Sequence, residues 1–175
     1  LVGFGLTTIW PNLHNSGLLP MGSAILAMGL FVGGAAQILA GLLEYPSGNT
    51  FGLTAFVSYG AFWISLVALI ALPHTGIVPA STPAMVGSYL LLWGLFTLFM
   101  FVGTLRATRA PQVIFGSPVI LFAMLGLSAL LETPPLSIAA RYDGLFCGLS
   151  AASPAAPQVP DAPFRHHLPP CVPPR

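Results

Sequence analysis

Charged residues are scarce in this chain, and lysine is absent altogether. Only 5% of the 175 residues are Asp, Glu, Lys or Arg, whereas soluble domains carry about 25%. So few charges could not cover a water-exposed surface, which excludes a soluble globular protein. The net charge of +1 also excludes the strongly basic surface that nucleic-acid binding requires. We therefore expect the lipid bilayer to be the solvent for most of the chain.

Motifs of catalysis and cofactor binding are missing as well. The two cysteines, Cys147 and Cys171, do not have the spacing of a metal or redox site, and the sequence contains no hydrolase triad, phosphate loop or haem motif. We therefore expect no cofactor, no metal and no enzyme activity. A basic leader with a cleavage site is also missing. Because Leu1 already lies in an apolar run, we expect further residues to precede it.

Long apolar runs, by contrast, are abundant. A transmembrane helix needs about 20 mostly apolar residues, and four runs meet this length: 21–43, 50–72, 83–105 and 111–131. Two shorter runs flank them: 1–13, interrupted by Pro11, and 138–152, which contains Arg141 and Asp143. The pattern predicts an all-α, polytopic transmembrane helical bundle over residues 1–152, with a partial first and a partial last span.

Residues 153–175 differ abruptly from the rest of the chain, because eight of them are proline. A proline inside a helix costs about 3 kcal/mol, so this segment cannot complete a membrane helix. We predict a Pro-rich disordered tail here. The abrupt change suggests a shifted reading frame or a fused segment, and a natural proline-rich tail is the alternative.

The placement of arginine predicts the topology. Arg106 and Arg109 lie in the short connection between the runs 83–105 and 111–131. The positive-inside rule places such a connection in the cytoplasm. Counting back through the spans then puts the N-terminus in the cytoplasm and the connection 73–82 outside the cell.

Amide side chains within the apolar runs are candidates for function. Asn12 lies near the end of the first run, and Gln37 lies deep in the second. An unsatisfied polar group in hydrocarbon is costly, so such residues usually face the interior of the bundle or a wet passage. Both side chains are therefore candidates for binding a substrate.

Hydroxyl groups form a second set of candidates at the start of the run 50–72. Thr50, Thr54 and Ser58 recur every four residues and share one helical face, with Tyr59 beside them. This stripe could line a pore; the alternative is that the hydroxyls bond to their own helix or to a neighbour. Asn49 is a candidate N-cap, whose helix N-terminus would attract an anion. Capping alone is the alternative.

Distinctive motifs also run through most of the chain. The segment GFGLTT at 3–8 is followed by NLHN at 12–15, and the segment 34–62 reads GAAQILAGLLEYPSGNTFGLTAFVSYGAF. The segment LFMF at 98–101 and the pair Cys147-Gly148 continue the series. Over about residues 1–152 this combination resembles the acetate uptake transporter family.

The resemblance implies a six-helix fold, a homohexamer in the inner (plasma) membrane, and a separate passage in each subunit for small carboxylates such as acetate and succinate, with protons as the coupled ion. It implies that the passage is narrowest at a phenylalanine, a tyrosine and a leucine, which fall on Phe4, Tyr59 and Pro118. Proline thus stands in place of the leucine, which bears on pore width and selectivity. Ala151 falls on a further pore-lining position.

The leading functional hypothesis is a membrane transporter for acetate and related small carboxylates. In this hypothesis Phe4 and Tyr59 form an apolar constriction, and Asn49, Thr50 and Thr54 offer hydrogen-bond donors near it. Two alternatives stay open: an acetate-selective anion channel, and a membrane sensor or structural protein that binds acetate without moving it. Binding without flux would identify the last.

Overall fold

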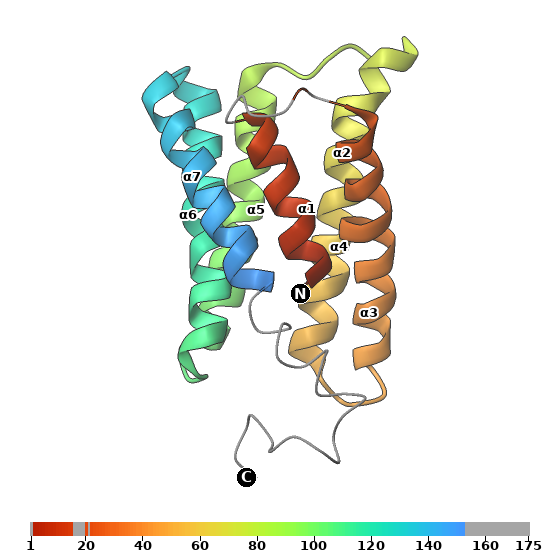
Figure 1. The fold of residues 1–175 in the computed structure, drawn as a ribbon, viewed down its shortest axis with the longest axis vertical. Helices are drawn as coiled ribbons and strands as arrows, with labels where there is room; N and C mark the ends of the chain where they lie inside the picture. The colour runs from red at the N-terminus through yellow and green to blue at the C-terminus, as the bar shows by residue number, and fades with distance from the viewer. Residues whose placement is uncertain (1, 16–19, 21, 153–175) are drawn as a thin grey trace.

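The described part of the chain is helical throughout. The computed structural model describes residues 2–15, 20 and 22–152, and every regular element in them is a helix. This confirms the prediction of an all-α bundle. The predicted Pro-rich tail, 153–175, lies outside the described residues. Figure 1 shows the helices standing side by side, with the connections between them at the two ends of the bundle.

Long apolar helices occupy the runs that the sequence predicts. The second span is built from α2 (Ser23–Met28), a π-helical stretch η1 (Gly29–Ala36) and α3 (Gln37–Glu44), which follow one another without a break. The next three spans are α4 (Thr50–Ala71), extended by a single 3-10 turn η2 (Leu72–Thr75), then α5 (Pro83–Thr104) and α6 (Arg109–Leu131). Each of these four spans is long and apolar enough to cross a membrane.

Helices α1 (Val2–Asn15) and α7 (Pro134–Ala152) correct two details of the prediction. Pro11 does not interrupt α1, which continues for another turn. Side chains can satisfy backbone groups that a proline disturbs in a membrane helix, and the Nδ2 of Asn12 donates to the carbonyl of Thr8 at 2.8 Å. Helix α7 begins at Pro134 rather than at residue 138, because proline is tolerated in the first helical turn.

Glycines allow α1 and α7 to pack closely. A Cβ atom built on Gly148 would lie 2.8 Å from the carbonyl oxygen of Gly5, and one built on Gly144 would overlap the side chain of Asn12. Ala140, on the same helix, is fully buried. Small residues of this kind let the backbones of membrane helices approach one another, and here they place α1 in the middle of the bundle (Figure 1).

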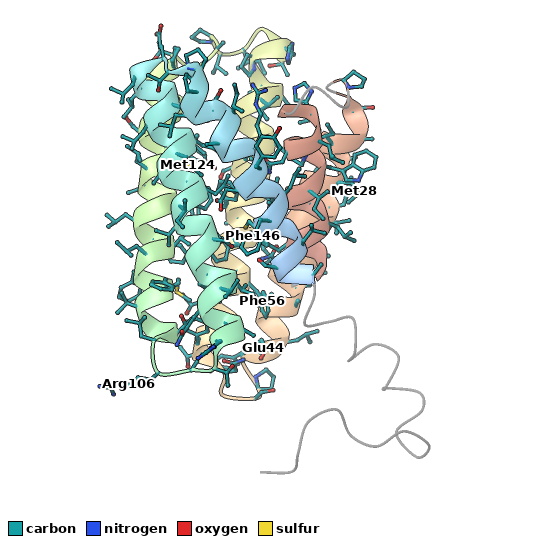
Figure 2. The ribbon with its side chains drawn as sticks, turned by 60° about the vertical axis from the view of Figure 1, so that its left-hand side comes forward. Met28, Glu44, Phe56, Arg106, Met124 and Phe146 are labelled. Carbon is teal, nitrogen blue, oxygen red and sulfur yellow. The ribbon has the colours of Figure 1, made fainter. Side chains whose placement is uncertain are left out.

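The start of α1 points toward the end of the bundle that carries the arginine-bearing connection. Figure 1 shows the N-terminal end of α1 toward the end where α3 turns into α4, and Figure 2 places Glu44 and Arg106 together at that end. The connection after α5 is fastened there by Gln112, whose Nε2 donates to the carbonyls of Leu105 and Ala107, each at 3.2 Å.

Candidate passage in the bundle interior

A small cavity lies between α1, α3, α4 and α6. Its volume is about 20 Å³, which is room for one water molecule, since a water needs about 10–15 Å³ on this measure. The side chains around it are almost all apolar. They are Phe4, Gln37, Ala55, Phe56, Tyr59, Ile114, Phe115 and Pro118.

Tyr59 is the most constrained member of this lining. Its ring lies 5.6 Å from the ring of Phe4, 6.2 Å from that of Phe115 and 5.7 Å from that of Phe96, measured between centroids. Its hydroxyl donates to the Oγ1 of Thr97 at 3.0 Å. Because that bond engages the polar end of Tyr59, the ring is held in place and presents an apolar surface to the cavity.

Gln37 brings an amide to the cavity wall. Its side chain is 6% exposed, and its Oε1 has no hydrogen-bond partner among the described residues. It is the first residue of α3, directly after the π-helical stretch η1, and π-helical stretches frequently occur at functional sites. A buried amide oxygen without a partner is costly, so the Oε1 of Gln37 is a polar atom that a ligand in this cavity could bind.

The pore-lining residues that the family resemblance implies lie around this cavity, with one exception. Phe4, Tyr59 and Pro118 come from three different helices and line the same space. Ala151 is fully buried in the same cluster of side chains as Phe4 but is not part of the cavity wall. Asn12 is also buried; its Nδ2 donates to α1 itself, and its Oδ1 has no hydrogen-bond partner among the described residues.

The hydroxyl stripe lies elsewhere. Thr50 and Thr54 are exposed, and the Oγ1 of Thr54 donates to the carbonyl of Thr50 at 2.8 Å, as in the alternative interpretation. Ser58 is half-buried in a groove beside α5. None of the three lines the cavity that Tyr59 lines.

Asn49 acts as an N-cap, as predicted. Its Oδ1 accepts from the N–H of Gly52 at 3.0 Å, and its Nδ2 donates to Glu44 at 2.6 Å. Both ends of the amide are therefore engaged in closing the turn between α3 and α4, at the end of the bundle.

Two neighbours of Tyr59 escaped the sequence analysis. Thr97 is fully buried and accepts a hydrogen bond from the tyrosine hydroxyl. The sequence did indicate it, because it is a hydroxyl residue in the middle of an apolar run, like the candidates chosen elsewhere in the chain. Phe115 carried no comparable signal, because it is one of 12 phenylalanines and only the packing of α6 against α4 distinguishes it.

The fold is that of a polytopic helical membrane protein, and its candidate site is a narrow, mostly apolar cavity in the interior of the bundle. The family model described as the GPR1/FUN34/yaaH family matches residues 1–159. The chain belongs to this family, which confirms the resemblance found in the sequence.

Relatives with named functions cover most of the chain. It is 52% identical over 151 residues to the succinate-acetate/proton symporter SatP of Escherichia coli strain K12, a match that spans 86% of this chain and 80% of that protein. It is 32% identical over 168 residues to acetate permease A of Emericella nidulans, spanning 86% and 56%. A solved structure described as the bacterial acetate channel SatP superimposes with a TM-score of 0.89 at 49% identity, covering 96% of this chain and 93% of that one.

Proposed function

We propose that this protein moves acetate and related small carboxylates, succinate among them, across a membrane, together with protons. The observation that carries the proposal is the cavity at the centre of the bundle, where Phe4, Tyr59 and Pro118 meet around a space for one water. The names of the relatives support the substrate class and the coupling to protons. Transport is favoured over catalysis because these relatives are described as transport proteins.

The size and chemistry of the cavity indicate which substrates it would let through. Acetate is larger than the water-sized space of about 20 Å³, so a ring must turn aside to let it pass. An apolar constriction penalises a bare charge and strips its water. The amide of Gln37 offers both a donor and an acceptor to a carboxyl group. The constriction would therefore favour small substrates, and their neutral acids over the hydrated anions.

A channel is the second candidate, favoured by the description of the superimposed structure as an acetate channel. The two mechanisms share the same passage and differ in coupling. A symporter accumulates acetate against its gradient when a pH gradient is applied, whereas a channel for the anion follows the membrane potential. A sensor that binds acetate without moving it would show neither.

The protein's surroundings are part of the proposal. We place it in the inner (plasma) membrane with the start of α1 and Arg106 in the cytoplasm, since the positive-inside rule applies to that short connection. Large apolar side chains on the outside, such as Phe31 at 65%, Leu43 at 75% and Phe99 at 73% exposed, suit lipid or neighbouring subunits. A homohexamer is the assembly that we propose.

The test uses the full chain in proteoliposomes. Uptake of labelled acetate should exceed that of empty liposomes and should be reduced by unlabelled propionate or succinate. The variant Tyr59→Ala removes a ring from the constriction and should lower the preference for acetate over butyrate. The variant Phe31→Ala removes a ring from the outer surface and serves as the matched control, with the preference unchanged.

Two results would count against the proposal. Uptake no greater than in empty liposomes would exclude transport, and retention of acetate by the protein in the same preparation would then favour the sensor. An unchanged preference in the folded Tyr59→Ala variant, checked by size-exclusion chromatography, would show that the cavity is not the selective part of the path.

A further inference from the structure

A second, larger groove lies between α5, α6 and α7, apart from the cavity of the proposed passage. Its volume is about 620 Å³. From α5 it receives only apolar side chains, Leu98 and Phe101, and Phe146 borders it on α7, beside α6 (Figure 2). Its polar members are Arg109, Gln112, Ser117 and Asp143.

Asp143 is the unusual member of this lining. It lies within α7 and is half-buried, and its Oδ2 is buried without a hydrogen-bond partner among the described residues. Across the groove on α6, the Oγ of Ser117 is likewise buried, with only the weak donor of the Cys147 thiol beside it. Two oxygens from facing helices thus line the same groove without a strong donor bonded to them.

An ionised carboxylate in this position would be costly, because hydrocarbon and apolar side chains do not solvate it. A bound proton removes the charge and supplies a hydrogen-bond donor where the acceptors have none. A divalent cation is a poor alternative, since it needs about six oxygen ligands and the described residues hold no group of three or more His, Cys, Asp or Glu side chains.

Few other titratable groups surround this carboxyl. Helix α6 contributes only Arg109 and α1 only His14, which follows the Asn12 that packs on Gly144. Helix α7 itself contributes Cys147, one turn away, and the adjacent Arg141 and Tyr142.

The groove also offers a route from water. Arg109 and Gln112 line it at the end of α6 that adjoins the arginine-bearing connection, and Ser117 lines it further in. At 1.5 Å per residue, the helix covers about 12 Å between Arg109 and Ser117. The groove therefore runs along the outer side of α6, from the end of the bundle that carries Arg109 to the level of Ser117 and Asp143.

We propose that Asp143 is a proton-binding site on the outer side of the bundle, reached through this groove from the end that carries Arg109. The step is a transfer from hydronium to the carboxylate, which yields a carboxylic acid and water and is reversed on release. The coupling of this proton to the carboxylate substrate rests on the proposed function. The existence of the proton-binding site does not depend on it.

Infrared titration of the full chain in lipid tests the site directly. The chain has four acidic residues, so the carboxyl region of the spectrum is simple. The carbonyl band of a protonated carboxylic acid should persist at neutral pH. An ordinary exposed glutamate has a pKa of about 4.3 and is ionised at that pH. The band should disappear in Asp143→Asn and remain in Glu132→Gln, a control at an exposed position.

Absence of the band from the unmodified protein at neutral pH would overturn the proposal, and so would its survival in Asp143→Asn. If that variant fails to fold, Asp143→Glu decides: the band should remain at a shifted frequency, and an unshifted band would contradict the assignment.

Transport provides the second measurement. In proteoliposomes, Asp143→Asn should lose the accumulation of acetate that an imposed pH gradient drives, while Glu132→Gln keeps it. Equal accumulation in both variants would refute the coupling role. No uptake by the unmodified protein would refute the proposed function instead, and the infrared result would still decide whether Asp143 binds a proton.

Discussion

The hydrogen bond between Tyr59 and Thr97 allows a quantitative test of the packing around the proposed passage. The tyrosine hydroxyl donates to Thr97 Oγ1 at 3.0 Å, and that Oγ1 donates in turn to the carbonyl of Trp93 at 2.7 Å. Both side chains are buried, at 5% and 0% exposure. The two partners are therefore unequal. When the tyrosine hydroxyl is removed, Thr97 keeps its hydrogen bond to Trp93, but when the Thr97 hydroxyl is removed, the tyrosine hydroxyl has no partner left.

This asymmetry sets the expected magnitudes. The variant Tyr59→Phe removes one neutral hydrogen bond and leaves Thr97 satisfied, so it should lower the free energy of unfolding by about 0.5–1.5 kcal/mol, toward the lower end in a membrane protein, where such bonds average about 0.6 kcal/mol. The variant Thr97→Val strands the tyrosine hydroxyl in an apolar environment and should cost about 1–3 kcal/mol. The double variant should cost less than the sum of the two, because no hydroxyl is then stranded.

Reversible unfolding of the detergent-solubilised protein, followed by tryptophan fluorescence, measures all three variants against the unmodified chain. The expected order of destabilisation is Thr97→Val above Tyr59→Phe, with positive coupling between the sites. A Tyr59→Phe variant that is as unstable as Thr97→Val, or strictly additive losses, would refute the inference that the tyrosine hydroxyl depends on Thr97 alone.

Two further variants test the helix packing and the cap. Gly148→Ala should destabilise the protein by about 1–3 kcal/mol, because its Cβ would lie 2.8 Å from the carbonyl of Gly5 and 2.6 Å from the side chain of Ile9. Gly22→Ala is the control, since a Cβ there would meet nothing within 4 Å. Equal thermal stability of the two variants would contradict the close packing of α1 and α7. Asn49→Ala should cost about 0.5–2 kcal/mol through the lost cap, whereas Asn49→Ser should retain most of the stability in the same unfolding measurement; an alanine variant as stable as the serine variant would show that the cap contributes little.

The helices were predictable because their signal is composition over a fixed length. Runs of about 20 apolar residues bounded by turn residues gave the four long spans to within a turn. The errors fell at prolines. Pro11 was expected to interrupt the first span and Pro134 to precede the last one, yet Pro11 lies inside α1 and Pro134 begins α7. In α1, side chains can satisfy the backbone groups that the proline disturbs, whereas the first turn of α7 tolerates a proline because an N–H there would have no partner within the helix.

The site was only partly predictable. Gln37 stood out as an amide within an apolar run, and the structure places it on the cavity wall. The hydroxyl stripe satisfied the same criterion, yet Thr54 faces outward and bonds to its own helix. Helical periodicity groups residues on one face but does not say which face meets another helix. The side of α4 that packs inward carries Ala55 and Tyr59, and that choice depends on contacts with α1 and α6 far away in the sequence.

Pro118 connects the shape of the cavity to the form in which a substrate would enter it. Proline has no N–H, so it cannot donate to the carbonyl of Ile114, one turn earlier, and both residues line the cavity. Gln37 adds an amide oxygen without a partner. A neutral carboxylic acid can donate its proton to such acceptors, whereas an acetate anion cannot donate at all and meets apolar rings on the other sides. In the proposed function, the constriction therefore favours the acid together with its proton, and the exchange of protons with water belongs to a different place, the groove lined by Asp143.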